Sequence, residues 1–469
     1  MKYLFGLSTL MLVSMTSAAE PKRLLWGDTH LHTTYSSDAF ANNNLLATPD
    51  TAYRYARGIP AIHPYHRARV EIDTPLDFLV VSDHAEFLGV IRHVYFDGVD
   101  TSETGFLDTL KARMAQWILR RAIDNQTGRQ LFVDVLPAPE EPREAAAVTL
   151  AGPGGNVGWL PPMPQVEIDT WDQITAAAER YNEPGVFTAL IGWEWSSIPG
   201  GANLHRVVLT DANADTASGF QPFGLDDSPY PEDLWAWLEQ TSSATGADFL
   251  AIPHNSNISK GFMFDTRTLR GDEFTQDYIA RRSKWEKIAE ITQIKGDSET
   301  HPDLSPEDEF ADFELYPFYI QSKPTEYVAA EGDYLRSTLR RGLEMESKLG
   351  DNPYRLGFIG STDAHTSLPS AEEGNFHGKL PPVGDTVDRL TGQFSNTVGD
   401  PQLEAVWQDP QFDPGQAAFY YARVLQIPTS RHSLYDRLAR NKDAATGRPD
   451  TIQERAYTSP IWYRPDVAP

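Results

Sequence analysis

Two histidines stand two residues apart at the end of an apolar run near the start of the chain. The stretch GDTHLHTTYSSDAF, from Gly27 to Phe40, contains His30 and His32. Side chains at positions i and i+2 of a β-strand point to the same face of the sheet. Two imidazoles on one face are poorly suited to an apolar core and well suited to holding a metal ion. The spacing therefore predicts metal-ion chemistry.

Further histidines and acids occupy the same kind of position elsewhere in the chain, within short apolar runs or at their ends. Burial of so many ionisable groups without partners would be very costly, and a shared site for several metal ions satisfies them together. The candidates are His30, His32, His84, Glu194, His205, His254, Asp363 and His365.

The donor atoms of these side chains limit the choice of metal. The chain contains no cysteine, so thiolate ligands are excluded. Imidazole and carboxylate together suit Zn²⁺, Mn²⁺ or Fe²⁺, whereas Ca²⁺ prefers oxygen alone. The candidates are too many for one ion, so we expect two to three divalent metal ions. Glu194, within GWEWSS, is the carboxylate expected to bridge them.

The elements that position these residues are short apolar strands separated by helices. Helical patterns such as TWDQITAAAERY and PEDLWAWLEQTSS precede two of the strands. Continuous apolar strands are typical of parallel sheets covered by helices on both faces. Functional residues at the carboxyl ends of such strands predict an α/β fold with the layout of a β/α barrel. The seven predicted strands are RLLWGDTHLH, LDFLVVSDH, VFTALIGWEW, NLHRVVL, DFLAIPHN, IAEITQI and RLGFIGSTDAH.

A long insertion, at about residues 90–165, separates the second predicted strand from the third. It begins with a cationic helical stretch, LDTLKARMAQWILRRAID, and continues with a segment rich in Pro, Ala, Glu and Gly over residues 136–165. We expect the second segment to be an irregular surface excursion, and whether it forms a lid is left open. No boundary between two domains is visible, so residues 20–469 are expected to form a single domain.

The first 19 residues have the pattern of a cleaved secretory signal, with Lys2, an apolar stretch from Leu4 to Val13, and small residues before the cleavage site. We therefore expect a periplasmic or secreted protein. The net charge of −26 argues against nucleic acid and against an anionic membrane as partners. No later apolar run is long enough to span a bilayer.

The ordered set of motifs resembles the polymerase-and-histidinol-phosphatase (PHP) superfamily. GDTHLHTTYSSDA resembles its first motif, VVSDHAEF its second and GSTDAH its last. More narrowly, IPHNSN, QIKGDSETHP and IQERAYTSPIWY resemble the DUF3604 family within it. The resemblance implies a distorted (β/α)7 TIM-like barrel of the PHP type with long loop insertions, and up to three metal ions at the carboxyl ends of its strands.

The resemblance also implies a ligand set for each ion. Asp38 depends on the register of the loop at Ser36 and Ser37, and its alternative role is to cap the following helix. The family pattern assigns His30, His32, Glu194 and Asp363 to a first ion, Glu194, His205 and His254 to a second, and Asp38, His84 and His365 to a third.

Three loop residues are candidates for acting on substrate. His301, in GDSETHP, is a candidate general acid, and Lys260 and Lys295 are candidates for binding a phosphoryl oxygen. The alternative for His301 is a loop histidine paired to nearby acids, and the alternative for each lysine is an ordinary surface residue. The role of Glu290 and Glu299 is also left open, because acidic loop residues are usually only solvated.

Other polar residues beside the candidate ligands have structural interpretations. Asp28 and Asp83 either orient imidazoles or pair within turns. Arg206 is expected on the strand face opposite to His205, and Trp193 and Trp195 are expected in the core.

We expect an exported multinuclear metal-dependent hydrolase that uses a metal-bridging hydroxide on a small anionic phosphoester. The preference for phosphoesters comes from the resemblance and from the charge of clustered cations. Alternatives are an amidohydrolase-like enzyme that cleaves amide, lactone or carboxylic ester bonds, and a non-catalytic metal-binding protein. No serine-hydrolase, P-loop or dinucleotide motif competes. The identity of the substrate and the oligomeric state are left open.

Overall fold

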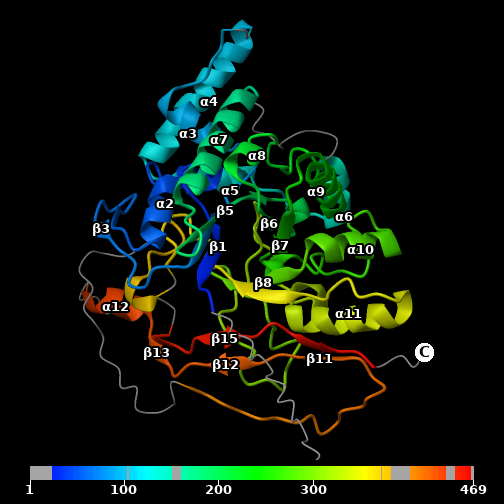
Figure 1. The fold of residues 1–469 in the computed structure, drawn as a ribbon. Coiled ribbons are helices and arrows are strands. Elements are labelled where there is room, and N and C mark those ends of the chain that lie inside the picture. Colours follow the sequence, from blue (N-terminus) through cyan, green and yellow to red (C-terminus); the bar gives the residue numbers. More distant parts are fainter. Residues whose placement is uncertain are drawn as a thin grey trace, which may run out of the picture.

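The computed structural model describes residues 24–102, 105–149, 160–370, 372–381, 402–439 and 449–465 (Figure 1). The expected signal sequence therefore lies outside the described residues. So does the Gly-rich part of the insertion, residues 150–159.

A curled five-stranded sheet forms one half of the protein around the candidate ligands. Its order is β1-β4-β5-β6-β7. These strands are buried along most of their length, as expected for apolar runs covered on both faces. Their bounds are β1 (Gly27–Leu31), β4 (Phe78–Val81), β5 (Thr188–Trp195), β6 (Arg206–Thr210) and β7 (Phe249–Pro253).

The direction of β6 differs from the parallel arrangement expected from the sequence. β1, β4 and β5 are parallel, but β6 runs antiparallel to both β5 and β7. Only ten residues separate Trp195 from Arg206, with a 3₁₀ turn at Pro199–Gly201. A parallel crossover needs a dozen or more residues, usually with a helix, so the short connection dictates the reversal.

A second sheet, of order β10-β8-β9, carries the remaining two predicted strands. β8 (Ile288–Gln293) is parallel to β10 (Gly357–Gly360) and antiparallel to β9 (Gly296–Asp297). β8 lies beside β7, and an isolated bridge joins Leu31 of β1 to Ala364, just after β10. All seven apolar runs thus form strands, but the described residues contain no continuous ladder that closes them into a barrel.

Helices cover the outside of these sheets, and the two helical patterns quoted above fall within α7 and α9. α9 ends at Gly246, whose φ of 79° suits glycine as a helix terminator. The helices are α1 (Ser37–Ala41), α2 (Pro49–Ala56), α3 (Val90–Phe96), α4 (Phe106–Asp124), α5 (Gly128–Val135), α6 (Pro142–Thr149), α7 (Pro164–Tyr181), α8 (Ala214–Ala217), α9 (Pro231–Thr245), α10 (Gln276–Trp285), α11 (Leu335–Leu349) and α12 (His432–Ala439).

The insertion is more regular than the sequence indicated. The cationic stretch forms α4 as expected, but part of the segment expected to be irregular forms α6. The run REAAAV within α6 has high intrinsic helix propensity, which the flanking prolines obscured. Figure 1 shows α3, α4 and α7 at one end of the molecule, away from the C-terminal strands.

The C-terminal segment forms short antiparallel pairs against the second sheet. Tyr421 and Arg423 contact Glu299, and the Tyr457 hydroxyl donates to Asp297 at 2.9 Å. These contacts attach the segment to the body of the protein. The remaining strands, including the pair before β4, are β2 (Ala61–Ile62), β3 (Arg69–Val70), β11 (Ala418–Tyr420), β12 (Arg423–Leu425), β13 (Thr429–Ser430), β14 (Thr451–Ile452), β15 (Arg455–Tyr457) and β16 (Ile461–Tyr463).

The main core lies between the five-stranded sheet and its helices. Trp193 and Trp195 are buried there as expected, and their indole nitrogens donate to backbone carbonyls at 3.2 and 3.0 Å. Among the helices that the structure describes, none is both long and apolar enough to cross a membrane.

Candidate metal centre

The strands bring the candidate ligands together at one edge of the sheet. His30 lies in β1, Glu194 is the second-last residue of β5, and His254 follows β7. His205 comes directly before β6, and because β6 is reversed, its first residue lies at the same edge as the last residues of β5 and β7. The reversal that departs from the expected parallel sheet is therefore what places His205 in the group.

Backbone contacts fix the loops that carry the other ligands. The amide of Asp363 donates to the carbonyl of His30 at 2.8 Å, and the amide of His32 donates to the carbonyl of Ala364 at 2.9 Å. An isolated bridge similarly joins His84 to Glu194. Asp363 has a φ of 53°, an uncommon conformation for a residue other than glycine that is often found at functional sites.

The first group contains His30, His32, Glu194 and Asp363. Oε2 of Glu194 lies 3.3 Å from Nε2 of His30 and 3.1 Å from Nε2 of His32. Oδ1 of Asp363 lies 3.4 and 3.3 Å from the same two nitrogens. The four side chains are almost fully buried. The structure thus brings together the set that the family pattern assigns to a first ion.

The second group uses the other oxygen of Glu194. Its Oε1 lies 2.6 Å from Nδ1 of His205 and 2.8 Å from Nε2 of His254. Glu194 therefore faces one group with each oxygen, which is the geometry required of a bridging carboxylate.

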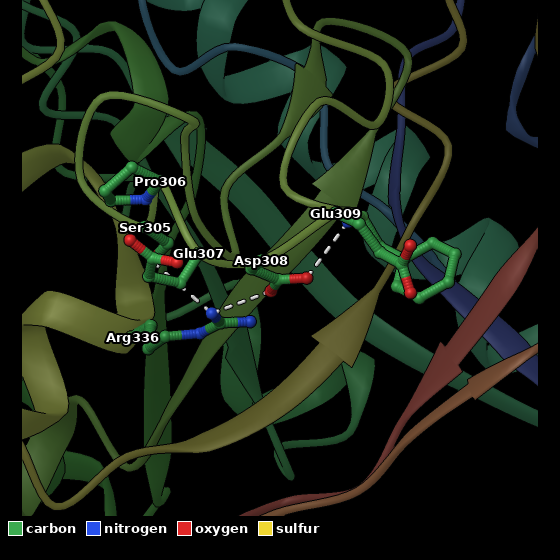
Figure 2. Close-up of a pocket in the computed structure, with 7 residues that line it drawn as sticks. Ser305, Pro306, Glu307, Asp308, Glu309 and Arg336 are labelled. Atoms are coloured by element: carbon green, nitrogen blue, oxygen red, sulfur yellow. Dashed lines mark hydrogen bonds and ion pairs between the residues drawn. The ribbon is translucent and has the colours of Figure 1, made fainter.

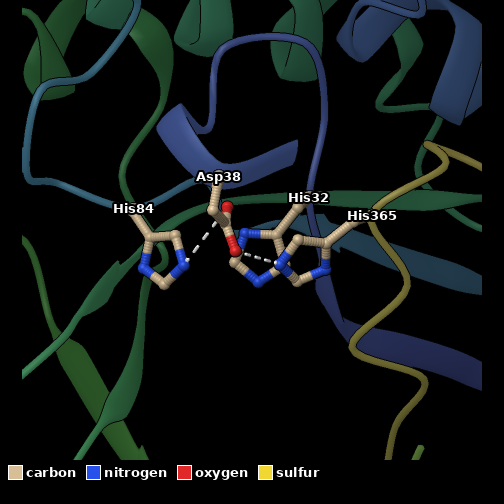
Figure 3. A group of neighbouring side chains, drawn as sticks. All are labelled: His32, Asp38, His84 and His365. Atoms are coloured by element: carbon tan, nitrogen blue, oxygen red, sulfur yellow. Dashed lines mark hydrogen bonds and ion pairs between the residues drawn. The ribbon is translucent and has the colours of Figure 1, made fainter. Parts of the chain in front are cut away.

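The third group contains Asp38, His84 and His365, with His32 beside them (Figure 3). Asp38 points toward both histidines, with Oδ2 2.6 Å from Nε2 of His365 and Oδ1 3.6 Å from Nε2 of His84. The N-cap of α1 is Ser36, so Asp38 does not occupy the capping position considered as its alternative.

Unpartnered atoms test whether these residues fit metal ions. Nε2 of His32 and Oδ1 of Asp363 are buried and have no hydrogen-bond partner among the described residues, although they lie 3.3 Å apart. Buried polar atoms are rarely left without partners. An imidazole nitrogen and a carboxylate oxygen that converge in this way are suitable ligands for a divalent cation. The buried groups are therefore able to hold metal ions.

Three side chains orient the imidazoles. Oε2 of Glu290 lies 3.0 Å from Nδ1 of His30, and the hydroxyls of Ser36 and Ser196 lie 2.9 and 2.5 Å from Nδ1 of His32 and His84. Contacts of this kind fix the ring so that the other nitrogen faces the metal. The role of Glu290 was left open above, although an acid inside the apolar run IAEITQI was a signal for a buried partner.

Asp28 and Asp83 contact other groups. Asp83 accepts from the amide and hydroxyl of Thr33 at 2.5 and 2.6 Å, and Asp28 accepts from the amide of His30 at 2.9 Å and from Thr362. Asp28 and Asp83 therefore hold the loops that follow β1 and β10. This role corresponds to pairing within turns, the second of the two interpretations given for them from the sequence.

Burial and charge shift the protonation equilibria of the ligands. Burial raises the pKa of Glu194, but His84 and His254 outweigh it and hold the pKa well below its usual range. Burial lowers the pKa of His205 to about 4, so this ligand is neutral at pH 7, as metal binding requires. Burial opposes protonation of His30, yet Asp363 and Glu290 raise its pKa well above the usual value. The negative charges around His30 therefore favour a positive charge at this position.

Two lysines lie against the outer oxygen of Asp363. The Lys295 ammonium contacts Oδ2 of Asp363, and the Lys379 ammonium lies 2.9 Å from the same atom and 3.2 Å from Nδ1 of His365. Lys295 was a sequence candidate, whereas nothing in the sequence around Lys379 marked it. Burial raises the pKa of Asp363, but these two ammonium groups outweigh it and hold the pKa well below its usual range.

The structure does not bring Lys260 or His301 into this group. The Lys260 ammonium donates to the carbonyl of Gly200 at 2.5 Å and to the side-chain oxygen of Gln321 at 3.0 Å. Nδ1 of His301 lies 3.4 Å from Asp303, and its ring is tilted against those of Tyr327 and Tyr334. Both residues therefore have the structural partners that their ordinary-loop interpretation requires.

Glu299 and Arg206 also have structural partners. Glu299 accepts from Arg336, Arg423 and Tyr421, and Arg206 pairs with buried Glu286 at 2.9 Å. Arg206 is thus directed away from the site, as its place on the strand predicted.

A cavity of about 530 Å³ lies elsewhere (Figure 2). Asp308 in its wall is paired with Arg336 at 2.8 Å, and the lining includes none of the candidate ligands. The one cation among the described residues of its lining is thus already paired with an acid, so the buried cluster with unpartnered imidazole and carboxylate atoms is the stronger candidate for chemistry. The lining residues are Ser305, Pro306, Glu307, Asp308, Glu309, Phe310 and Arg336.

Fold and site together define a mixed α/β protein with a curled half-barrel sheet and a buried His/Asp/Glu cluster able to hold metal ions. The chain belongs to the DUF3604 family, described as protein of unknown function, which matches residues 19–382 and 379–465. Comparisons with curated proteins and with solved structures find no match.

Proposed function

We propose that this protein is a metal-dependent hydrolase of small anionic phosphoesters. The observation that carries the proposal is Glu194, a buried carboxylate that faces one set of histidines with each oxygen. A site built this way suits two neighbouring ions, and the third group extends it. We include in the proposal the exported location, which the signal-like sequence at the N-terminus supports.

The proposal extends to the finer fold and the superfamily. We infer that β1, β4, β5, β6, β7, β8 and β10 form a distorted seven-stranded barrel of the PHP type. The bridge from Leu31 to Ala364 and the proximity of β7 to β8 support this arrangement. The motif resemblance and the place of the ligands at one sheet edge support membership of the PHP superfamily.

The chain's own residues would prepare the site as follows. Oε2 of Glu290 would accept a hydrogen bond from the N–H at Nδ1 of His30, which leaves the lone pair of Nε2 for the metal. Asp363 presents Oδ1 to the histidines and Oδ2 to the lysines, so one carboxylate links the metal groups to a cationic rim. When bound, divalent ions would acidify a water molecule and neutralise charge on phosphoryl oxygens.

Lys295 supports an anionic substrate. Its side chain is 12% exposed, and Asp363, which it shares with Lys379, is the one acidic group that it pairs with directly among the described residues. The ammonium group therefore has donors left for a substrate oxygen at the rim of the site.

The test is turnover by mature protein reloaded with Mn²⁺ or Zn²⁺ on phosphate mono-, di- and triesters and a carboxylic ester. His30→Ala is the test variant. His93→Ala is the matched control, because His93 is a partly exposed histidine on α3 that pairs with Asp97. We expect phosphoester hydrolysis that His30→Ala abolishes and His93→Ala retains.

Other outcomes favour the alternatives. Cleavage of the carboxylic ester alone would replace the proposal with an amidohydrolase-like enzyme. The protein would instead be a non-catalytic metal-binding protein if it binds metal but turns over none of the esters, and if His30→Ala changes its metal content alone.

A further inference from the structure

The helix α4 presents a row of large apolar side chains to solvent. Its buried residues, Ala112, Leu119 and Ile123, lie on one side and pack toward the body of the protein. No described residue covers the opposite side. The exposed residues there are Phe106 (82%), Leu107 (68%), Leu110 (57%), Met114 (49%) and Trp117 (60%).

These five residues form one continuous stripe, which we call the α4 face. At 3.6 residues per turn they fall within about 100° of the helix circumference. Isolated exposed apolar residues are normal, but a contiguous set on one helix indicates an interaction surface. Figure 1 shows α4 projecting at one end of the molecule, so a large partner can reach this face.

Cationic side chains border the α4 face. Lys111 and Arg113 are exposed and lie on its two sides in the helical projection, with Lys111 also paired to Asp108 at 3.1 Å. The Arg121 guanidinium lies 5.6 Å from the ring of Trp117 at the C-terminal end of the face. The helix carries four basic and two acidic residues, in a chain whose net charge is −26. A surface complementary to this face would present apolar groups with negative charges beside them.

An anionic lipid surface has that composition. In an interfacial helix, Trp, Phe and Leu enter the boundary between headgroups and acyl chains while flanking Lys and Arg contact anionic headgroups. A symmetric pairing with a second copy fits less well, since a two-fold axis on this face would bring the cations of both copies together. We propose that α4 docks this protein onto an anionic membrane surface.

This proposal departs from the expectation drawn from the net charge. That expectation averages charge over the whole chain, whereas electrostatic repulsion is screened over a Debye length of about 8 Å at physiological salt. The local charge of α4, with four basic and two acidic residues, therefore bears on its docking more than the net charge of the whole chain does.

The test is co-sedimentation of the full metal-loaded protein with phosphatidylcholine vesicles, with and without phosphatidylglycerol, at low and high salt. The variant Leu110→Gln/Trp117→Gln removes two side chains from the α4 face. Leu403→Gln/Trp407→Gln is the matched control, because these residues have the same types and are 68% and 70% exposed outside α4.

We expect wild type and control to bind the phosphatidylglycerol vesicles and to be released by salt. The α4 variant should bind at least about tenfold more weakly, with unchanged far-UV circular dichroism and metal content. Equal binding by both double variants would overturn the proposal, as would no binding by the wild type. A wild-type dimer that the α4 variant converts to monomer in light scattering would also overturn it, by showing that a second copy covers the face.

Discussion

At the scale of single residues, the candidate metal centre depends on the side chains that orient the candidate ligands as much as on those ligands themselves. Glu290 and Ser36 each contact the ring nitrogen of a histidine that faces away from the cluster. Asp363 divides its two oxygens between histidines and lysines. These residues set which atom of each ligand is available.

Replacing Glu290 with Gln keeps a hydrogen-bond acceptor beside His30 but removes its charge. We expect metal affinity to fall by about 10- to 100-fold, as is usual when a group that orients a ligand is altered. Competition with a chelator in metal titration measures the change. Glu183→Gln, which alters an exposed acid paired with Arg57, is the control and should bind metal like the wild type. Unchanged affinity in Glu290→Gln would show that His30 needs no orienting charge.

Replacing Lys295 with Met tests the cationic rim. For a phosphomonoester, KM should rise by about tenfold, the usual value of one charge-assisted hydrogen bond, while metal content stays the same. A neutral phosphotriester should show a much smaller change in KM. An equal effect on both esters would mean that Lys295 acts through Asp363 alone and does not contact substrate.

At the scale of elements, the reversed strand β6 serves both the site and the core. His205 directly precedes the first residue of β6 and therefore lies in the cluster. Arg206, the first residue of β6, points the other way, to Glu286 at the end of α10. Glu286 also pairs with Arg282 at 3.0 Å and accepts from Trp235 of α9 at 3.0 Å. One buried carboxylate thus joins β6, α9 and α10.

Glu286→Gln should lower the free energy of unfolding by about 3 kcal/mol at pH 7, because two buried guanidinium groups lose their counter-charge. Burial raises the pKa of Glu286, but Arg206 and Arg282 outweigh it and lower the pKa below its ordinary value of 4.5. The stabilisation is therefore present above pH 4.5 and is lost as the pH falls through the lower folded-state pKa.

Urea unfolding of metal-free wild type and Glu286→Gln, from pH 7 downward, measures this dependence. The difference between the two proteins should shrink as the solution becomes acidic. A difference that stays constant down to acid pH would show that the lost stability comes from packing and not from charge.

At the scale of the whole molecule, the cluster places many ionisable groups inside a chain without disulfides. A ligand that binds the folded state alone stabilises it by about 2.7 kcal/mol when its concentration is a hundred times its Kd. Bound metal is therefore expected to contribute to global stability, since the cluster draws on β1, β5, β7 and the loop after β10.

Removing metal with a chelator should lower Tm by several degrees, and adding back Mn²⁺ or Zn²⁺ should restore it. Differential scanning calorimetry measures the shift, with His30→Ala as the protein that should respond less. A Tm that is the same with and without metal would contradict a folded-state metal site.

Local patterns in the sequence are enough to predict the strands, the types of candidate ligand and most of the candidate set. The seven apolar runs form strands because continuous apolar character requires burial, and His30, His32, Glu194, His254 and Asp363 follow from their places at strand ends. These properties are local, so neighbouring residues are enough to reveal them.

The direction of the strands and the contacts between distant groups follow from packing in the folded protein. The reversal of β6, the contact of Glu290 with His30, the arrival of Lys379 at Asp363 and the uncovered side of α4 depend on residues far apart in the chain. A periodic pattern predicts which side of a helix or strand is buried. Packing across the whole fold sets the direction of a strand, the partner of a charged side chain and the exposure of a helix face. For that reason the sequence predicts a metal centre, whereas the contacts that orient its candidate ligands and the exposure of the α4 face are seen only in the folded protein.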